Sequence, residues 1–581
     1  CNYPLLVGQQ TNLYKCVLEN TMDLASEERG FIGLLTPESI YDDPKGQPLR
    51  RELYKRLRYH FQYVNTLKLF REVLHWVTYS SNIIGRRKES PSFYSINNLY
   101  HPSTIDGCFT HDGYGECGGL KTSDGQWNTN AHKDRIIQYD SDKLALLSNI
   151  FEDGITNDSV NLVNIHSSES LSILAKIEKF PTHVRDKQHI ITVCFDETGA
   201  PNAGIIKRDT HYANVEEYDM IYNGPHFYVA NPFCKNPRKE CIVANRDYDT
   251  LDLTNMDSSF MSRSNYRRTI PINSFKSYVQ GFKKKDGNGN NIIENYLDYY
   301  KVGFRNMMSQ SGERTLICAV LPRKTAHING VRSISFLNRT YTVDIAALCA
   351  STVLDFYMKT IGSDNLMPSR MQSFPLGVEE KYQSAMYSRT LLLNCLTVHY
   401  ADLWQSCWRP EYAQEEWSLS DPRLKPFTGL TEEWTWDTPL RNYFERRQAL
   451  VEIDVLAAMA LGLSLKDLEL IYTIQFPVLQ QNENDTWYDA KGNIVFTSSK
   501  GLNGVGCERK EWETIRGSLS KDGMTYEGTA PTYVHTIDPK KSEMYGGEEV
   551  TYYAPYNKCD RITDYRRAWA FFENKYNKEL N

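Results

Sequence analysis

Three groups of basic residues are spaced so that they could neutralise a polyanion. They are Arg86-Arg87-Lys88, Lys283-Lys284-Lys285, and Arg263, Arg267 and Arg268 around Asn265. Arg and Lys side chains contact phosphate oxygens, and Arg and Asn side chains can also read base edges in the major groove of DNA. A basic run can equally be a solvated face, so these residues are candidate DNA contacts that need a fold to position them.

Other candidate chemistries have less support. His111-Asp112 and His226 are acid-base residues by type, but no nucleophile motif of the G-x-S-x-G kind accompanies them. The segment Asp42-Asp43-Pro44-Lys45 carries the Asp and Lys of a nuclease without room for a second carboxylate before the Lys. We therefore expect turn or structural roles for these residues.

The composition is that of a folded protein with several domains. A chain of 581 residues exceeds what one hydrophobic core organises, and 41% hydrophobic residues argue against disorder. The formal net charge of −6 means that DNA binding would need a local basic groove. Aromatic residues reach 12%, which fits base stacking, sugar binding or large cores rich in Tyr.

Cysteine usage and hydropathy indicate the cellular compartment. The 13 Cys residues form no C-x-x-C pair, and an odd number fits neither a disulfide framework nor a zinc ribbon. The closest spacings, Cys108 to Cys117 near His111 and Cys234 to Cys241, are too wide for a zinc knuckle. No apolar run approaches the roughly 18 residues of a membrane span, and the mean hydropathy is −0.53. We expect a cytoplasmic protein without a metal site or a membrane partner.

The first hundred residues predict half of an α/β sheet. The expected elements are helices over residues 12–28 and 49–59 and strands over residues 31–35, 61–64 and 76–84. The first strand is short and apolar, as expected for a parallel strand buried on both faces. We expect the last two strands to form a hairpin-like antiparallel pair, which Gly85 ends.

The rest of the chain mixes turns, short strands and helices. A Gly-rich loop precedes helical stretches around residues 141–151 and 167–180, and short strands follow over residues 189–195 and 315–321. Residues 283–290 form a polar segment that we interpret as a flexible basic loop. A strong helix over residues 443–461 stops at Gly462, and Ser464 with Asp467 caps another helix that reaches Gln475. Residues 487–496 predict a hairpin.

The first hundred residues resemble the later motifs of an amino-group DNA methyltransferase. The resemblance rests on Gln10-Thr11-Asn12-Leu13-Tyr14, on Gly30-Phe31-Ile32-Gly33-Leu34-Leu35-Thr36-Pro37-Glu38 and on residues 49–70. Residues 222–229, 309–316, 446–457 and 485–489 extend it over most of the chain. The chain is similar to the large adenine-specific methyltransferases of fused restriction-modification enzymes and of the BREX and DISARM defence systems. This resemblance implies S-adenosylmethionine as cofactor, double-stranded DNA as partner, and other restriction or defence subunits as further partners.

Two motifs of that family are missing from the sequence. One is the Gly-rich loop that binds S-adenosylmethionine, and the other is Asn-Pro-Pro-aromatic, for which Asn231-Pro232-Phe233-Cys234 is the nearest approach and reads as a turn. We therefore expect the catalytic half upstream and no catalytic residue in this chain. A flipped adenine must be stacked between flat groups. The resemblance places Phe70 in that pocket, and Trp76 or Tyr79 could supply a second ring, unless all three pack in the sheet.

The expected architecture has four parts. Residues 1–100 hold the second half of a Rossmann-like α/β methyltransferase sheet, and residues 101–185 are an elaborated connection with helices. Residues 186–380 are an α+β target-recognition domain, and residues 381–581 are a mixed, largely helical region with a hairpin. On the helix over residues 443–461, we expect Arg446 and Arg447 to pair with Glu445, Glu452 or Asp454.

The resemblance implies adenine-N6 methylation at a specific DNA sequence, in restriction-modification or phage defence, with this chain supplying late motifs and specificity. One alternative is a DNA-binding specificity subunit whose catalytic partner is a separate chain. The other is a carbohydrate-binding surface lipoprotein attached through Cys1 that uses Trp and Tyr as stacking platforms. We favour a missing front over a processed lipoprotein, because residues 3–8 follow Cys1 without a polar linker.

Overall fold

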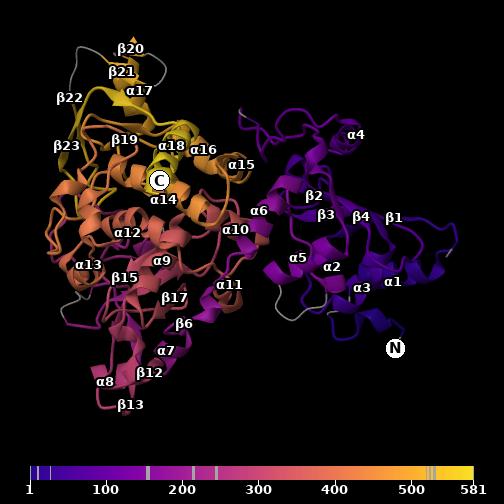
Figure 1. The fold of residues 1–581 in the computed structure, drawn as a ribbon, viewed down its shortest axis with the longest axis horizontal. Coiled ribbons are helices and arrows are strands. Elements are labelled where there is room, and N and C mark those ends of the chain that lie inside the picture. Colours follow the sequence, from indigo (N-terminus) through magenta and orange to yellow (C-terminus); the bar gives the residue numbers. More distant parts are fainter. Residues whose placement is uncertain are drawn as a thin grey trace. The chain divides into compact units, whose positions relative to one another are not determined.

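The structure is a computed structural model. It describes residues 2–9, 12–26, 28–122, 124–151, 157–211, 216–241, 247–517, 520–521, 525–527 and 532–579, so Gln10 and Thr11 of the first motif lie outside it. The chain forms two compact units. Unit 1 comprises Cys1–Phe180, Phe356–Gly362 and Leu470–Pro477, and unit 2 comprises Pro181–Asp355, Ser363–Glu469 and Val478–Asn581. In Figure 1 unit 1 is largely indigo and purple, and the end of unit 2 is yellow.

Unit 1 is built on a mixed five-stranded sheet of order β1-β3-β2-β4-β5. The strands are β1 (Ile32–Pro37), β2 (Leu57–Val64), β3 (Thr78–Ile84), β4 (Phe93–Leu99) and β5 (Ile137–Tyr139). β3 lies between β1 and β2 and is antiparallel to both, so β1 and β2 run parallel to each other. β2 pairs parallel with β4, and β4 pairs antiparallel with β5. The predicted antiparallel pair of β2 and β3 is confirmed.

Helices connect and cover these strands. They are α1 (Leu13–Leu24), α2 (Ser39–Asp42), α3 (Gln47–Arg56), α4 (Ser103–Thr110), α5 (Ser141–Phe151) and α6 (Ser168–Glu178). The helix predicted over residues 49–59 ends at Arg56 because β2 begins at Leu57. In Figure 1, α3 and α4 lie on opposite sides of β2 and β3.

The sheet face toward α2 and α3 carries buried polar side chains. They are Thr36, His60, Gln62, Ser80, Asn82, Ser95 and Asn97. The Tyr41 hydroxyl of α2 donates to Oδ1 of Asn82 at 2.5 Å, and Nδ1 of His60 lies 2.9 Å from Oγ of Ser95. Since buried polar groups are costly unless paired, this network fixes how the helices sit on the strands.

The prediction that the first strand is parallel and buried on both faces was wrong. β1 pairs only with β3 in the described part of the chain, and that pairing is antiparallel. Leu35 is 60% exposed, and Phe31, just before β1, is 74% exposed. The reason is that β3 occupies the inner edge of β1 while no described strand occupies its outer edge.

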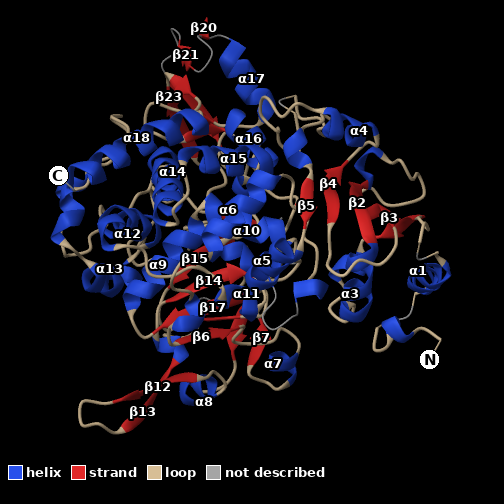
Figure 2. Ribbon diagram, turned by 45° about the vertical axis from the view of Figure 1, so that its right-hand side comes forward, coloured by secondary structure: helices blue, strands red, loops and turns tan. Residues whose placement is uncertain are grey.

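Unit 2 is an α+β assembly around an antiparallel sheet of order β15-β14-β17-β6. These strands are β6 (His189–Thr192), β14 (Lys301–Arg305), β15 (Cys318–Leu321) and β17 (Val331–Phe336). The larger helices are α9 (Arg339–Ala350), α12 (Glu380–Asn394), α14 (Tyr443–Ala460) and α18 (Arg561–Glu579). Smaller helices are α7 (Gly199–Asn202), α8 (Ile272–Ser277), α11 (Pro368–Gln372), α13 (Ala401–Cys407) and α17 (Arg509–Gly517). Figure 2 separates these helices from the strands by colour.

Three helices each have some residues in unit 1 and the others in unit 2. They are α10 (Thr352–Ile361), α15 (Leu465–Gln475) and α16 (Pro477–Asn484). Ser464 and Asp467 bond reciprocally at the start of α15, so the predicted cap is confirmed. The predicted stop of α14 is also confirmed, since Leu461 caps it and Gly462 has a φ of 70°.

Short strands complete unit 2. The two-stranded pairs are β7 (Ile206–Arg208) with β11 (Tyr266–Arg268), β8 (Ile221–Tyr222) with β16 (Ala326–His327), β9 (Lys235–Pro237) with β10 (Tyr248–Thr250), β12 (Gly281–Lys285) with β13 (Asn291–Asn295), and β22 (Thr532–Thr536) with β23 (Glu549–Tyr553). A further sheet holds β18 (Trp487–Tyr488), β19 (Ile494–Phe496), β20 (Ser520–Lys521), β21 (Thr525–Glu527) and β24 (Tyr556–Asn557). β18 and β19 confirm the hairpin predicted over residues 487–496.

The long helix α14 is buried around most of its circumference, including its charged residues. Arg446 donates to the backbone carbonyls of Leu393, Leu440 and Ala230, whereas Arg447 pairs with Glu483 and Asp564. The expected pairs within α14 were therefore wrong. The helix is enclosed by other elements, so its cations find partners across the packing contacts.

The acidic residues of α14 bind arginines from other helices. Arg389 of α12 has no exposed side-chain surface, and its Nε donates to Glu452 at 2.5 Å. Nη2 of Arg389 also donates to the Glu416 carbonyl, and Lys575 of α18 binds the neighbouring Glu415. This buried network joins α12, α14 and α18.

We predict that Arg389→Met strongly destabilises unit 2. Removing the cation leaves the Glu452 carboxylate buried without its partner, which costs about 3–5 kcal/mol of unfolding free energy. The matched control is Arg566→Met, because Arg566 is 62% exposed and pairs with Glu469 at the surface. That change should cost less than about 1 kcal/mol. Equal shifts of the guanidinium unfolding midpoint in both variants would contradict the prediction.

Candidate nucleic-acid interface

Aromatic side chains gather where the parallel strands β1 and β2 end. The Tyr63 and Tyr79 rings stack with centroids 5.2 Å apart and planes 6° apart, and the Phe70 ring meets Tyr79 edge-on at 4.9 Å. Burial and the neighbouring Tyr79 raise the pKa of Tyr63 to about 12, so this phenol stays neutral. Ligands of open α/β sheets bind at the carboxyl ends of the parallel strands. Two of the predicted pocket residues, Phe70 and Tyr79, therefore meet at the edge where a ligand is expected.

A buried asparagine holds the loop that carries Phe70. Asn65 follows β2, is fully buried, and donates through Nδ2 to the carbonyls of Phe70 and Val73 at 2.8 Å each. Its Oδ1 accepts the Phe70 backbone N–H at 3.1 Å. The sequence analysis did not single out Asn65, although an Asn directly after a strand is a usable signal of a loop anchor.

Phe70 and Trp76 are accessible from solvent. Phe70 is 41% exposed and Trp76 is 62% exposed, and the Trp76 ring contacts His75 edge-on at 4.7 Å. Trp76 precedes β3, and its ring packs against His75 and not, within the described part of the chain, against Tyr79. The structure thus brings Phe70 and Tyr79 together and leaves Trp76 as a separate exposed ring of the same loop.

Helix α1 and strand β1 carry exposed large apolar residues. They are Leu13, Val17 and Leu24 on α1, with Phe31 and Leu35 at β1, and their exposed fractions range from 47% to 85%. We name these five residues the β1 apolar patch. A concentration of large apolar side chains beside an unpaired strand edge is typical of a surface that another polypeptide segment covers.

The basic residues Arg86, Arg87 and Lys88 follow the end of β3. Arg87 binds Glu52 of α3 at 3.0 Å, whereas Arg86 is exposed and its carbonyl accepts from Arg58. Burial and the charges of Arg58 and Arg86 lower the pKa of Lys88, which shows that cations crowd this corner. Of these three basic residues, Arg86 is therefore the one whose charge is least balanced by nearby acidic residues.

The residues predicted around Asn265 differ in accessibility. Asn265 is 2% exposed, and its Oδ1 accepts from the Tyr248 hydroxyl at 2.6 Å and from Nδ2 of Asn223 at 3.1 Å. Arg268 binds Glu216 and Asp219. Arg267 lies 3.8 Å from Asp209, and Arg263 lies 3.9 Å from Glu543. These cations are largely paired with acids, and Asn265 serves the interior of unit 2.

The third basic group lies on a hairpin. The prediction of a loop over residues 283–290 was wrong for residues 283–285, which belong to β12 and pair antiparallel with β13, whereas residues 286–290 connect the two strands. Lys283 and Lys285 are exposed, whereas Lys284 on the other face binds Glu294. The charges concealed a strand whose inward residue is Phe282, which is 1% exposed. In Figures 1 and 2 the hairpin projects from unit 2.

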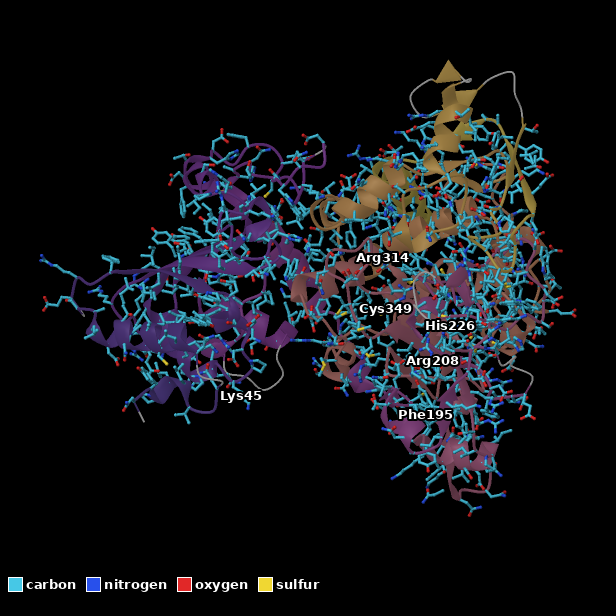
Figure 3. The ribbon with its side chains drawn as sticks, turned by 180° about the vertical axis from the view of Figure 1, so that it is seen from behind. Lys45, Phe195, Arg208, His226, Arg314 and Cys349 are labelled. Atoms are coloured by element: carbon cyan, nitrogen blue, oxygen red, sulfur yellow. The ribbon has the colours of Figure 1, made fainter. Side chains whose placement is uncertain are left out.

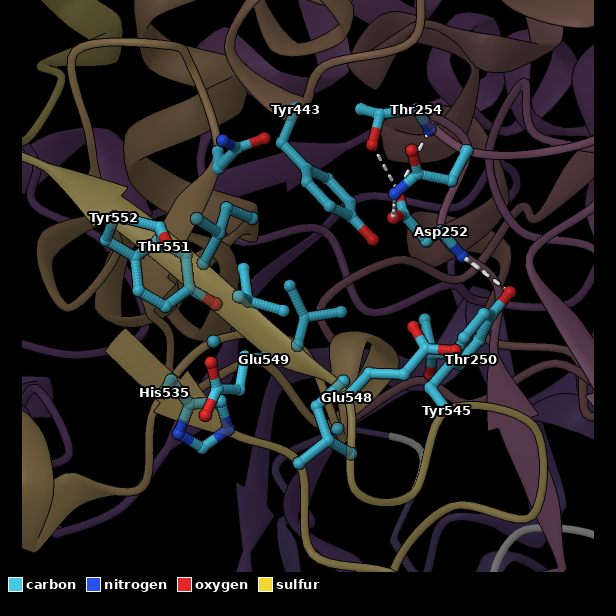
Figure 4. A pocket seen from close by; sticks show the side chains of 18 of the residues that line it. Thr250, Asp252, Thr254, Tyr443, His535, Tyr545, Glu548, Glu549, Thr551 and Tyr552 are labelled. Atoms are coloured by element: carbon cyan, nitrogen blue, oxygen red, sulfur yellow. Dashed lines mark hydrogen bonds between the residues drawn. The ribbon is translucent and has the colours of Figure 1, made fainter. Parts of the chain in front are cut away.

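The structure also contains a cavity that no sequence motif indicated. It has a volume of about 320 Å³ and lies between hairpin β22–β23 and the loop over residues 250–255. Figure 4 shows the Tyr443 ring pointing into it, with His535 and Glu549 on the opposite wall. The Tyr545 hydroxyl accepts the Asp252 backbone N–H at 3.3 Å. Its lining residues are far apart in the sequence, so local patterns could not reveal it.

The other acid-base candidates have structural partners. Nδ1 of His226 lies 3.0 Å from the Asn223 backbone N–H, and Nε2 lies 2.8 Å from the Arg263 carbonyl. Burial lowers the pKa of His226 to about 4. Figure 3 labels His226 and Lys45, and the Lys45 backbone N–H donates to Oδ1 of Asp43 in a turn. Nδ1 of His111 likewise accepts the Gly113 backbone N–H.

Comparisons with known proteins give one kind of similarity. No known protein-family model matches the chain, and no curated protein sequence matches it. Among solved structures, the chain is similar to the type IIL restriction-modification enzyme MmeI in complex with DNA, with 10% identity and a TM-score of 0.33 over 81% of this chain and 53% of that one. It is also similar to the type IIG restriction endonuclease BpuSI, with 11% identity and a TM-score of 0.26 over 79% and 50%. The chain thus spans about half the length of these two proteins. Among the described residues, no helix is long and apolar enough to cross a membrane.

We predict that His226 makes folding sensitive to acid. Its folded pKa of about 4 lies below the ordinary 6.5, so the unfolded chain takes up the proton first as the pH falls. The stabilisation is complete above pH 6.5 and is lost toward pH 4, by about 1.4 kcal/mol per pH unit. His226→Gln should flatten this slope in urea unfolding curves, whereas His211→Gln at an exposed site should not. Parallel slopes for the wild type and His226→Gln would refute the assignment.

Proposed function

We propose that this chain supplies the second half of the catalytic sheet and the DNA-recognition region of a site-specific DNA adenine-N6 methyltransferase of restriction-modification or phage-defence type. The observation that carries the proposal is β1, an apolar strand whose outer edge pairs with no other strand among the described residues and which carries the exposed Leu35. The family resemblance of residues 30–38 requires such an edge, because the strands that hold the cofactor loop and Asn-Pro-Pro-aromatic would pair there.

The proposal gives the aromatic cluster a role. S-adenosylmethionine would be bound mainly by the missing half, while Phe70 and Tyr79 at the ends of the strands would stack the flipped adenine. Trp76, exposed on the same loop, is the third candidate. Base flipping and alignment of the amino nitrogen with the methyl sulfonium are tasks of position, so a loop tied down by Asn65 suits them.

DNA contact is assigned to the exposed cations. Lys283 and Lys285 lie on a two-stranded ribbon, and the major groove admits such a ribbon. Arg86 and Arg87 would contact phosphates near the catalytic sheet, with Lys88 behind them. Arg263, Arg267 and Arg268 would have to leave acidic partners first, and we therefore rank them below the ribbon.

We predict that the full chain binds duplex DNA with strong salt dependence, and that Lys283→Ala with Lys285→Ala weakens it. Each lost phosphate contact should reduce the slope of log Kd against log salt by about 0.9. Lys284→Ala in the same strand is the matched control, because Lys284 already binds Glu294. Fluorescence anisotropy over a salt series measures both slopes. A salt-independent affinity, or an equal loss in the Lys284→Ala control, would count against DNA recognition by this ribbon.

The second test concerns the completed sheet. In the polypeptide or complex that carries the cofactor-binding half, we predict transfer of a tritiated methyl group from S-adenosylmethionine to DNA adenine. Leu35→Lys should lower that transfer at least about tenfold, because burying a leucine contributes about 1.5–3 kcal/mol and a lysine opposes burial. DNA binding by the same variant should persist.

The control for the second test is Met307→Lys, which changes an apolar residue that is 75% exposed in unit 2. Its methyl transfer should equal that of the wild type. Retained transfer in Leu35→Lys would show that β1 is not the joining edge. Absence of adenine methylation in the wild type, with salt-dependent DNA binding intact, would favour a specificity subunit without catalysis.

A further inference from the structure

Three chemically different metal ligands converge beside hairpin β22–β23 in unit 2. A thiol from Cys507, a carboxylate oxygen from Glu511 and a ring nitrogen from His535 all lie within 4.8 Å of one another. Within the described ranges of the chain, this is the one group of three or more such ligands at that spacing. The cluster is separate from the sheet and the basic residues assigned to DNA.

Two of the ligands lie at the beginning of helix α17. Glu511 is in the first turn of the helix, and Cys507 lies two residues before Arg509, where the helix begins. The Cys507 backbone N–H donates to the Val495 carbonyl of β19 at 2.6 Å. On the same helix Trp512 is 2% exposed, and its ring lies 5.4 Å from that of Trp487. Packing of the helix in the core therefore fixes Glu511, and the hydrogen bond to Val495 fixes Cys507.

The third ligand comes from β22. Nδ1 of His535 lies 2.9 Å from Oε1 of Glu511, and the Tyr533 hydroxyl donates to the same oxygen at 2.7 Å. Glu511 and His535 both line a second cavity of about 610 Å³, and their side chains are 23% and 16% exposed. The cluster thus has an accessible side opposite the buried thiol.

The charges of the cluster suit a divalent cation. Cys507 is a buried thiol close to the Glu511 carboxylate, and a thiol binds a metal ion only after it gives up its proton. A bound divalent ion would replace that proton, which would pass to solvent. One thiolate and one carboxylate then balance the two charges of the ion, and the imidazole binds as the neutral base.

We propose that Cys507, Glu511 and His535 bind one Zn²⁺ ion and leave one coordination position to water from the cavity. Zinc takes mixed sulfur, nitrogen and oxygen ligands in tetrahedral sites, whereas Mg²⁺ and Ca²⁺ select oxygen. The ion would fasten hairpin β22–β23 to α17 and so stabilise the walls of both cavities. This role does not depend on methyl transfer.

Cobalt titration of the full chain tests the site, because Co²⁺ bound by a thiolate in tetrahedral geometry absorbs in the near ultraviolet and the visible. After removal of metal with a chelator, we expect one equivalent of Co²⁺ to produce these bands and Zn²⁺ to abolish them. Cys507→Ser should lose the thiolate band, and His535→Gln should weaken binding more than about 100-fold, since even changes behind a ligand cost up to that factor.

Two variants serve as matched controls. His211→Gln removes a histidine outside the cluster whose Nε2 lies 3.0 Å from Glu240, so it matches the His535–Glu511 pair. Cys559→Ser removes a cysteine outside the cluster. Both should bind cobalt as the wild type does, and circular dichroism of the metal-free proteins checks the fold of every variant. Absence of the bands in the wild type, or an unchanged spectrum in both Cys507→Ser and His535→Gln, would overturn the proposal.

Discussion

The outer edge of β1 is the constraint on which the organisation of unit 1 depends. Peptide groups at a sheet edge either bond to water or pair with another strand, and proteins usually protect such edges with charges or bulges. Here the edge is flanked by Phe31 and Leu35, which are mostly exposed, and by the apolar stripe of α1. Exposed apolar side chains contribute little to the stability of unit 1. An edge of this kind could pair with another apolar strand, which would bury them.

The sheet of unit 1 carries polar side chains on one face and aromatic side chains at its strand ends. On the polar face, Asn82 forms hydrogen bonds with Tyr41 of α2 and Thr36 of β1, and His60 contacts Ser95 of β4. These bonds fix the positions of the strands. At the strand ends, Tyr63 and Tyr79 pack against each other and Phe70 remains partly open. A rigid polar layer therefore supports an accessible aromatic one, as base stacking would require.

Local sequence patterns predicted where helices and strands begin and end better than they predicted which strands pair. The end of α14 follows from Gly462, and the start of α15 follows from Ser464 and Asp467, because caps depend on residues a few positions apart. The insertion of β3 between β1 and β2 could not be predicted that way, since it pairs strands tens of residues apart. The charges of β12 likewise concealed its alternation, which only Phe282 and its packing reveal.

The candidate sites follow the same division. Phe70 was predicted because it lies at the end of the motif over residues 49–70, whereas the buried state of Asn265 depends on Asn223 and Tyr248 from other elements. The cluster of Cys507 and His535 joins residues separated by helix α17 and strands β20 and β21, so its spacing matches no short metal motif. Chemistry assembled by tertiary contacts is visible only once the fold is known.

In hairpin β12–β13, the residues that hold the fold differ from the residues that face solvent. Phe282 at the base packs on Tyr299 with ring centroids 4.8 Å apart, and Asp286 caps the turn by accepting the backbone N–H groups of Asn288 and Asn290. The outward residues Lys283 and Lys285 therefore do not contribute to the core. Evolution can rewrite them one residue at a time, and a graft of another ribbon onto the same base would leave the remainder of unit 2 undisturbed.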